Sequence, residues 1–238
     1  MAIQFYMNVI ITGASKGLGK AIAEEFAKAG NTLLICARTE TTLSDTRHEL
    51  LKKYPGCKVE MMAIDLGKKE NAIEFGNFCL QYGTPEIVVN NAGEFLPGSI
   101  HTEAEGTLEK MMEANLYSAY HLTRVLLPKM MEAKSGHIFN MCSIASIQAY
   151  PNGGSYSLSK FALLGLSKNL REEMKSFNIK VTAILPGAAY TDSWSRSGIP
   201  ESRFMEIRDV AKMVYAASQL SPQACVEEII LRPQLGDI

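Results

Sequence analysis

The first turn of the chain reads Thr12-Gly13-Ala14-Ser15-Lys16-Gly17-Leu18-Gly19, and it decides the fold. It follows an apolar run, Asn8 to Thr12, and leads into a segment in which Leu18, Ile22 and Phe26 recur every fourth residue. A strand that passes through such a turn into an amphipathic helix brings backbone N–H groups close to a bound phosphate. Side chains at the three glycine positions would obstruct the bend, the ligand or the packing of the helix. The turn therefore predicts a dinucleotide-binding site.

Strand-like and helix-like segments alternate along the rest of the chain, which predicts an α/β protein with a doubly wound, seven-stranded parallel sheet. The strand candidates are apolar throughout, as expected for strands buried on both faces. No linker or repeat divides them, so we expect one dinucleotide-binding domain over residues 1–238. The predicted strands are Asn8 to Thr12, Thr32 to Ala37, Lys58 to Asp65, Glu86 to Asn90, His137 to Cys142, Lys180 to Leu185 and Val226 to Leu231. Besides the first helix, which ends before Gly30, the predicted helices are Thr41 to Lys53, Lys69 to Tyr82, Leu108 to Ala133, Ser157 to Phe177 and Ile207 to Leu220.

The composition excludes several classes of function. The chain has 238 residues, of which 47% are hydrophobic and 21% charged, and its net charge of −1 does not favour binding to nucleic acid. No apolar run approaches the roughly 18 residues that span a bilayer, and no signal peptide is evident, so we expect a cytoplasmic protein without membrane contact. The five cysteines and four histidines form no ligand-like cluster, which predicts reduced thiols and no metal.

The same turn also matches G-x-S-x-G, the pattern around the nucleophile of serine hydrolases, with Ser15 as the serine. Such an enzyme needs an acid and then a histidine later in the chain. No histidine follows His137, and the pattern leaves Gly19 unexplained. The dinucleotide interpretation therefore accounts for more of the sequence than the hydrolase does.

The end of the second predicted strand bears on the choice of cofactor. Sites selective for NAD usually carry an acidic residue there, which binds the adenosine ribose. This chain has Arg38 instead, and Lys16 in the glycine-rich turn is placed to approach the same point. A guanidinium and an ammonium suit the 2′-phosphate of NADP(H), although both are also common as solvated surface charges. We expect NADP(H).

A second group of polar residues follows the fifth predicted strand. Ser143 comes at its end, and Tyr156 and Lys160 open the next helix four residues apart. Residues at that spacing share one helix face, so both side chains can point into one cleft at the carboxyl end of the sheet. A neighbouring ammonium favours tyrosinate, so we expect Lys160 to lower the pKa of Tyr156 and to make it a proton donor and acceptor near neutrality.

Together these motifs resemble the short-chain dehydrogenase/reductase family over nearly the whole chain. Their order is the family's order, and the 13-residue separation of Ser143 and Tyr156 is its usual interval. The matching residues are Thr12-Gly13-x-x-x-Gly17-x-Gly19, Asp65, Asn90-Asn91-Ala92-Gly93, Asn115, Ser143, Tyr156-x-x-x-Lys160 and Pro186-Gly187 with Thr191.

The resemblance implies a role for each matching position in the reduction of a carbonyl. Tyr156 would protonate the carbonyl oxygen, Ser143 would orient it, and Lys160 would hold the nicotinamide ribose. Asn115 would support a proton relay through water. The implied cofactor contacts are Gly13, Ser15, Lys16, Gly17, Leu18, Gly19, Arg38, Thr39, Asp65, Leu66, Asn91, Ala92, Gly93, Tyr156, Lys160, Pro186, Gly187, Ala189 and Thr191.

The substrate is less well defined by the sequence. Residues 191–206 would form a short lid, in which Trp194 would be an aromatic wall beside the substrate or an ordinary packing residue. The Pro186 to Trp194 stretch and the C-terminal sequence resemble bacterial sepiapterin-reductase-type members, which suggests a sepiapterin-like or small diketone substrate. A 3-oxoacyl-thioester is the alternative, and a non-catalytic NADP-binding sensor on the same fold stays open. The resemblance also implies a homodimer or homotetramer.

Overall fold

The structure is a computed structural model that describes residues 6–191 and 198–238. Within these residues, seven parallel strands form one sheet in the order β3-β2-β1-β4-β5-β6-β7, which confirms the doubly wound α/β fold. The strands are β1 (Asn8–Thr12), β2 (Thr32–Ala37), β3 (Lys58–Ala63), β4 (Ile87–Asn90), β5 (Gly136–Met141), β6 (Ile179–Pro186) and β7 (Glu228–Leu231).

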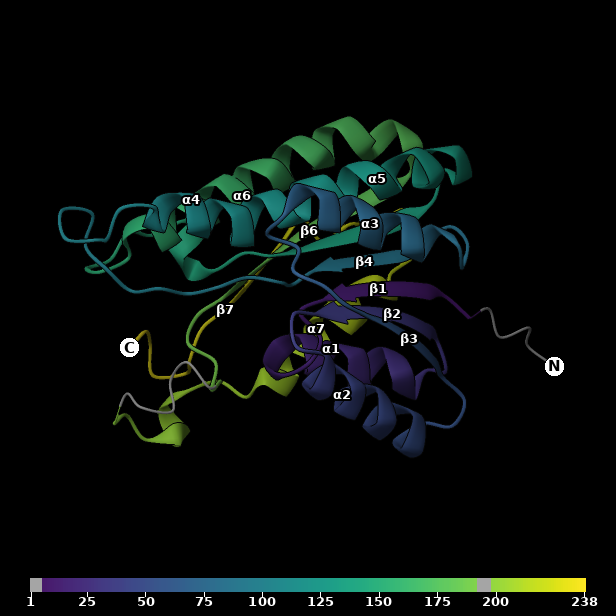
Figure 1. The fold of residues 1–238 in the computed structure, drawn as a ribbon, viewed down its shortest axis with the longest axis horizontal. Coiled ribbons are helices and arrows are strands. Elements are labelled where there is room, and N and C mark those ends of the chain that lie inside the picture. The colour runs from purple at the N-terminus through teal and green to yellow at the C-terminus, as the bar shows by residue number, and fades with distance from the viewer. Residues whose placement is uncertain (1–5, 192–197) are drawn as a thin grey trace.

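Helices cover both faces of this sheet (Figure 1). One face carries α1 (Gly17–Lys28), α2 (Glu40–Lys53) and α7 (Ile207–Ser218), and the other carries α3 (Lys69–Leu80), α4 (Thr107–Met112), α5 (Ser118–Ala133) and α6 (Gly154–Met174). Successive residues of β1 belong to two separate cores: Val9 and Ile11 pack on the α1 side, and Ile10 packs on the α3 side. The buried strands are therefore apolar throughout, because each face has its own layer of helices.

The structure differs from the predicted elements at the edges of the sheet and in one helix. The edge strands β3 and β7 are shorter than predicted and partly exposed, because each has a neighbouring strand on one side only. The predicted helix from Leu108 to Ala133 is interrupted by a π-helical turn, η1 (Glu113–Tyr117), between α4 and α5. Short 3₁₀ turns also occur at η2 (Ile144–Ser146), η3 (Lys175–Phe177) and η5 (Glu201–Arg203).

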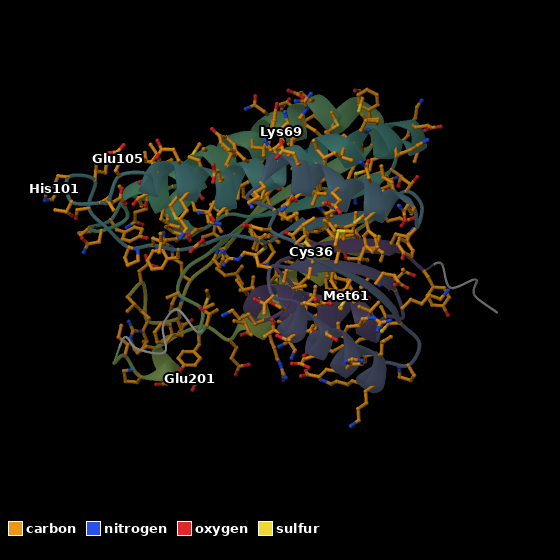
Figure 2. All side chains as sticks on the ribbon, in the orientation of Figure 1. Cys36, Met61, Lys69, His101, Glu105 and Glu201 are labelled. Atoms are coloured by element: carbon orange, nitrogen blue, oxygen red, sulfur yellow. The ribbon has the colours of Figure 1, made fainter. Side chains whose placement is uncertain are left out.

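The carboxyl ends of the strands lie at one end of the molecule, where the long connections gather. Figure 2 shows His101 and Glu105, on the connection from β4 to α4, and Glu201, on the segment before α7, at this same end. A doubly wound sheet binds ligands at the carboxyl ends of its strands, where the order of the strands reverses. Here that point lies at β1, between β2 and β4.

Candidate active site

The glycine-rich turn after β1 has the backbone that a phosphate site requires. Gly13 and Gly17 have positive φ angles of 65° and 56°, a conformation that L side chains rarely adopt. At Gly19 the space is already occupied, because a Cβ atom there would lie 2.3 Å from the Gly13 carbonyl oxygen. The three glycines are thus needed for the bend, for its approach by a ligand and for the packing of α1 against it.

Hydrogen bonds join this turn to the segment after β4. The Thr12 hydroxyl accepts from the backbone N–H groups of Asn91, at 2.9 Å, and Ala92, at 2.8 Å. The side-chain amide of Asn91 donates to the Thr12 carbonyl at 2.8 Å. A Cβ atom at Gly13 would lie only 3.0 Å from the Ala92 Cα atom. Two predicted cofactor segments, 13–19 and 91–93, therefore form one rigid edge.

The π-helical turn places Asn115 at the centre of the site. Its Oδ1 atom accepts from the Glu94 backbone N–H at 2.8 Å, and its Nδ2 atom donates to the Glu94 carbonyl at 3.0 Å and to the Ser159 hydroxyl at 2.9 Å. Asn115 is 1% exposed. It thereby fastens α6 to the segment after β4, and π-helical turns are common at functional sites. A role in a proton relay stays a prediction.

Lys160 projects from α6 into the same place. Its ammonium donates to the Met141 carbonyl at the end of β5, at 2.8 Å, and the residue is 6% exposed. A Cβ atom at Gly93 would lie 3.6 Å from the Lys160 Nζ atom and 2.7 Å from Asn115 Oδ1, so only glycine fits between them. Burial lowers the pKa of Lys160 to about 8, because the charged ammonium loses solvation.

Tyr156 lies one helical turn before Lys160, with its ring against Phe95. The two ring centroids are 4.8 Å apart at an angle of 80°, and Lys160 Nζ is 5.8 Å from the tyrosine ring centroid. Burial raises the pKa of Tyr156 to about 12, while a hydrogen bond with the Ser143 side chain acts in the opposite direction. The pKa of Tyr156 is therefore raised, and the prediction that it is lowered is wrong for this structure, because burial outweighs the hydrogen bond with Ser143.

Ser143 occupies the turn between β5 and η2. Its hydroxyl accepts from the Ala145 N–H at 3.1 Å, and its own N–H donates to the Ser146 hydroxyl at 3.1 Å. These reciprocal bonds form a capping box, which fixes the direction of the Ser143 side chain. The structure thus brings Ser143 to Tyr156 and collects Asn115 and Lys160 around the neighbouring turns of α6.

Glu103 is a residue of this region that the sequence analysis missed. It lies in the connection between β4 and α4, and its carboxylate accepts from the Ser155 backbone N–H at 2.8 Å and from the Ser155 hydroxyl. Gly154 permits this contact, because a Cβ atom there would overlap Glu103 Oε1. The carboxylate caps the amino end of the helix that carries Tyr156. No motif marks Glu103, since the contact joins residues 52 positions apart.

The adenosine end of the predicted groove is more open. Arg38 follows β2 with its side chain 63% exposed and 3.4 Å from the Glu94 carboxylate, and Lys16 is also exposed. Asp65, two residues beyond β3, accepts from the Gly67 N–H at 3.1 Å. Leu66 beside it is buried, and Thr39 precedes α2.

The opposite end of the groove is formed by the segment that follows β6. The Gly187 N–H donates to the Leu231 carbonyl at 2.7 Å, and Ala189 forms a parallel bridge with Met205. A Cβ atom at Gly17 would lie 3.9 Å from the Thr191 side chain, so residues 186–191 reach back to the glycine-rich turn. Trp194, the predicted substrate contact, lies outside the described residues.

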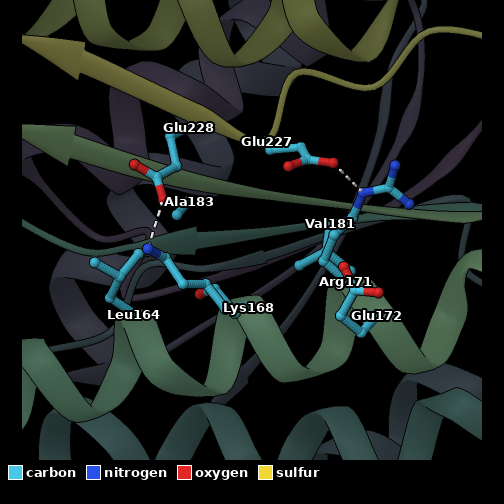
Figure 3. A pocket seen from close by; sticks show the side chains of 9 residues that line it. Leu164, Lys168, Arg171, Glu172, Val181, Ala183, Glu227 and Glu228 are labelled. Carbon is cyan, nitrogen blue, oxygen red and sulfur yellow. Dashed lines mark hydrogen bonds and ion pairs between the residues drawn. The ribbon is translucent and has the colours of Figure 1, made fainter.

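Two hollows lie elsewhere. One groove, of about 270 Å³, separates α6 from β7 and is bridged by the ion pairs Lys168–Glu228, at 3.2 Å, and Arg171–Glu227, at 3.0 Å (Figure 3). The other, of about 560 Å³, lies between residues 202–209 and residues 230–235. None of the four predicted catalytic side chains lines either hollow.

The described residues offer neither a metal site nor a membrane-spanning helix. No group of three or more His, Cys, Asp or Glu side chains is placed to hold a metal ion. None of the helices is long and apolar enough to cross a membrane.

Comparisons with known proteins agree with this geometry. The family model for short chain dehydrogenases matches residues 7–201. The chain is 32% identical to sepiapterin reductase of Chlorobaculum tepidum, over 97% of both chains. Among solved structures, it resembles an alcohol dehydrogenase of Thermococcus sibiricus complexed with 5-hydroxy-NADP, with a TM-score of 0.90, 28% identity and 97% of both chains covered. L-Sorbose reductase of Gluconobacter frateurii, complexed with NADPH and L-sorbose, has a TM-score of 0.87 and 27% identity over 95% of both chains.

The chain therefore belongs to the short-chain dehydrogenase/reductase family of oxidoreductases.

Proposed function

We propose that the protein reduces a ketone to an alcohol with NADPH, using Tyr156 as the proton donor. The observation that carries this proposal is the convergence of Ser143, Tyr156, Lys160 and Asn115 on one side of α6, beside the glycine-rich turn. Relatives of known structure hold NADP or NADPH. One unit of the fold would thus carry both the cofactor site and the reacting groups.

The residues around the turn fit a dinucleotide. The turn has Gly13 and Gly17 at positive φ, opens α1 and is hydrogen-bonded to Asn91 and Ala92, which suits a pyrophosphate. Arg38 and Lys16 would meet the 2′-phosphate, and Lys160 would hold the nicotinamide ribose. When bound, the nicotinamide supplies the hydride that the carbonyl carbon receives.

The protonation states of the two central side chains suit the reductive direction. With its pKa raised to about 12, Tyr156 keeps its proton at neutral pH and can donate it to the carbonyl oxygen as charge develops there. The Ser143 hydroxyl would orient that oxygen. Lys160, with a pKa of about 8, is mostly charged at pH 7 and would stabilise the tyrosinate left after donation.

The test is Tyr156→Phe, which removes the phenolic hydroxyl and keeps the ring that packs on Phe95. We expect NADPH binding, measured by fluorescence titration, to stay within about twofold of wild type, while ketone reduction falls by roughly 10²–10⁴-fold. Retained activity would refute the role of the proton donor. Cofactor binding by wild type without reduction of any ketone in a panel would instead favour the sensor.

For the substrate we propose a sepiapterin-type side-chain ketone or a small diketone, supported by the similarity to sepiapterin reductase over 97% of the chain. The predicted lid, residues 191–206, includes residues 192–197, which lie outside the described residues. Wild-type reduction rates with sepiapterin, diacetyl and a 3-oxoacyl-thioester discriminate the candidates. A preference for the thioester would overturn the pterin-type assignment.

We also propose self-association through the outward faces of α5 and α6. Tyr120 on α5, Leu158 and Phe161 on α6, and Tyr117 in η1 are large apolar side chains with exposed surface there. Aromatic residues are enriched in the cores of protein interfaces. Light scattering should show a dimer or tetramer, and Phe161→Glu should give a monomer. A monomeric wild type would overturn the proposal.

A further inference from the structure

An ion pair crosses the proposed cofactor groove at its adenosine end. Arg38 Nη1 lies 3.4 Å from a carboxylate oxygen of Glu94. Arg38 stands just after β2, and Glu94 stands four residues after β4. The strand between these two is β1, whose carboxyl end continues into the glycine-rich turn. The ion pair therefore crosses the carboxyl end of β1, beside the turn where the cofactor would lie.

Glu94 is the fixed member of this bridge. Asn115 holds its backbone at both polar atoms, by bonds of 2.8 Å and 3.0 Å, and the Glu94 side chain is only 22% exposed. A second cation, Lys110 on α4, lies 3.1 Å from the carboxylate with its side chain 54% exposed. One carboxylate of low exposure thus contacts two exposed cations, Arg38 after β2 and Lys110 on α4.

A carboxylate at this place conflicts with the cofactor chosen above. The 2′-phosphate of NADP(H) would need the same Arg38 guanidinium, and the Glu94 carboxylate, 3.4 Å from Nη1, would compete with it for that donor. A phosphate has more charge and more acceptor oxygens than a carboxylate, so the 2′-phosphate binds Arg38 in preference to Glu94. The competition nevertheless lowers the affinity for NADP(H). NAD(H), which lacks the 2′-phosphate, would bind without separating Arg38 from Glu94.

We propose that Glu94 is a specificity-determining residue, which competes with the 2′-phosphate for Arg38 and so forms an electrostatic latch across the adenosine end. This inference rests on the proposed use of NADP(H). The latch reduces the preference for NADP(H) over NAD(H) without touching the reacting groups. The hydrogen bonds to Asn115 are made by the Glu94 backbone, so a substitution of the Glu94 side chain keeps them.

Glu94→Gln tests the latch, because it removes the charge and keeps the shape. Dissociation constants for NADP⁺, NAD⁺ and 2′,5′-ADP would be measured by titration calorimetry. Exposed ion pairs have small energies, so we expect two- to fivefold tighter binding of NADP⁺ and 2′,5′-ADP, roughly the range of such pairs. Binding of NAD⁺ should stay unchanged, because it makes no demand on Arg38.

Two control variants separate the latch from general electrostatics. Glu105→Gln removes the same charge from the exposed connection before α4 and should leave all three constants unchanged. In an Arg38→Gln background, Glu94→Gln should have no further effect on the ratio of the NADP⁺ and NAD⁺ constants. Additive effects of the two substitutions would contradict competition for Arg38.

The outcomes also distinguish the inference from the function on which it rests. If wild type binds NADP⁺ no better than NAD⁺, and Glu94→Gln does not tighten the binding of NADP⁺, both the proposed cofactor and the latch fail. If wild type prefers NADP⁺ but Glu94→Gln leaves its binding unchanged or weakens it, only the latch is overturned. Weaker binding would mean that Glu94 holds Arg38 ready for the phosphate instead of competing for it.

Discussion

At the proposed catalytic end of the site Lys160 is 6% exposed and bonded to the Met141 carbonyl, whereas at the proposed adenosine end the Arg38 side chain is 63% exposed and in one ion pair. Fixed geometry at the first place suits a reaction, because a proton donor must already be aligned when the carbonyl arrives. Exposed charges suit the adenosine end, because they need only attract a phosphate. The two ends should therefore respond to substitution in different observables: kcat at one, affinity and salt dependence at the other.

The largest effect is expected from Lys160→Met, at the buried end. Loss of the ammonium should lower kcat for ketone reduction by roughly 10²–10⁴-fold. In wild type, kcat should fall as pH rises through about 8, the pKa to which burial lowers Lys160, because the group is then neutral. Steady-state rates between pH 6 and 10 provide the measurement.

The matched control for that substitution is Lys168→Met, on an outward turn of the same helix. Lys168 is 63% exposed in its ion pair with Glu228, so its loss should leave the pH profile intact. If Lys160→Met kept the wild-type pH profile of kcat, the proposed difference between the catalytic end and the adenosine end would be contradicted.

The second prediction concerns the exposed end. Arg38→Gln should weaken NADPH binding by roughly ten- to a hundredfold, the range for a lost hydrogen bond to a charged group, with kcat at saturating cofactor unchanged. The wild-type advantage should shrink as salt is raised, because exposed charges are screened. Michaelis constants for NADPH and NADH at two ionic strengths test this. Equal wild-type values for the two cofactors would contradict the phosphate site.

The fold was readable from the sequence because the strands carry apolar side chains to two cores. Val9 and Ile11 face one layer of helices and Ile10 the other, so each buried strand is recognisable by composition alone. The break in the helix predicted from Leu108 was not readable. No glycine or proline marks the π-helical turn, which follows from the bonds of Asn115 to Glu94 and Ser159 in the folded protein.

In the candidate site, too, some features could be predicted from the sequence and others depend on contacts in the folded protein. Spacing, together with the resemblance to the family, pointed to Ser143, Tyr156 and Lys160, because the last two share a helix face and the first ends a strand. Spacing does not show how deeply a side chain is buried, and the direction in which the pKa of Tyr156 shifts depends on its burial. Glu94 and Glu103 were missed because their partners are distant in sequence and no motif requires an acid at either position.

A third prediction places Glu103 between the two extremes. Glu103→Ala should lower kcat by roughly tenfold, because the amino end of α6 loses its cap and Tyr156 its alignment. Binding of NADPH should change little. Glu103→Gln keeps an oxygen for the Ser155 N–H and should recover most of the rate. If both variants lose activity equally, charge and not position is the contribution of Glu103.

The smallest effect is expected away from both ends, at His137 on β5. Its Nε2 atom lies 2.7 Å from the Thr182 hydroxyl, which itself donates to the Val226 carbonyl at 2.5 Å. The ring must then donate through Nε2, and Nδ1 has no hydrogen-bond partner within the described residues. Burial lowers the pKa of His137 to about 3.

The unfolded chain binds that proton near pH 6.5, so stability should fall as pH drops from 6.5 towards 3. Denaturant melts of wild type and His137→Gln at pH 7.5 and pH 5 test this. The loss on acidification should be smaller in the variant, even if the variant is less stable at both pH values. An equal loss would assign the acid sensitivity to other groups.

The π-helical turn has a consequence for how this chain tolerates changes in length. Its wider turn accommodates one extra residue between α4 and α5. The repeat of inward-facing residues is therefore shifted by one position from α4 to α5. Deleting one residue within Glu113–Tyr117 would leave a continuous, well-formed helix. Because the π-helical turn absorbs the extra residue, α4 and α5 would keep their orientations, but the local widening that presents Asn115 would be lost. Asn115 would then turn away from Glu94, so a single deletion could preserve the secondary structure and disconnect the two ends of the groove.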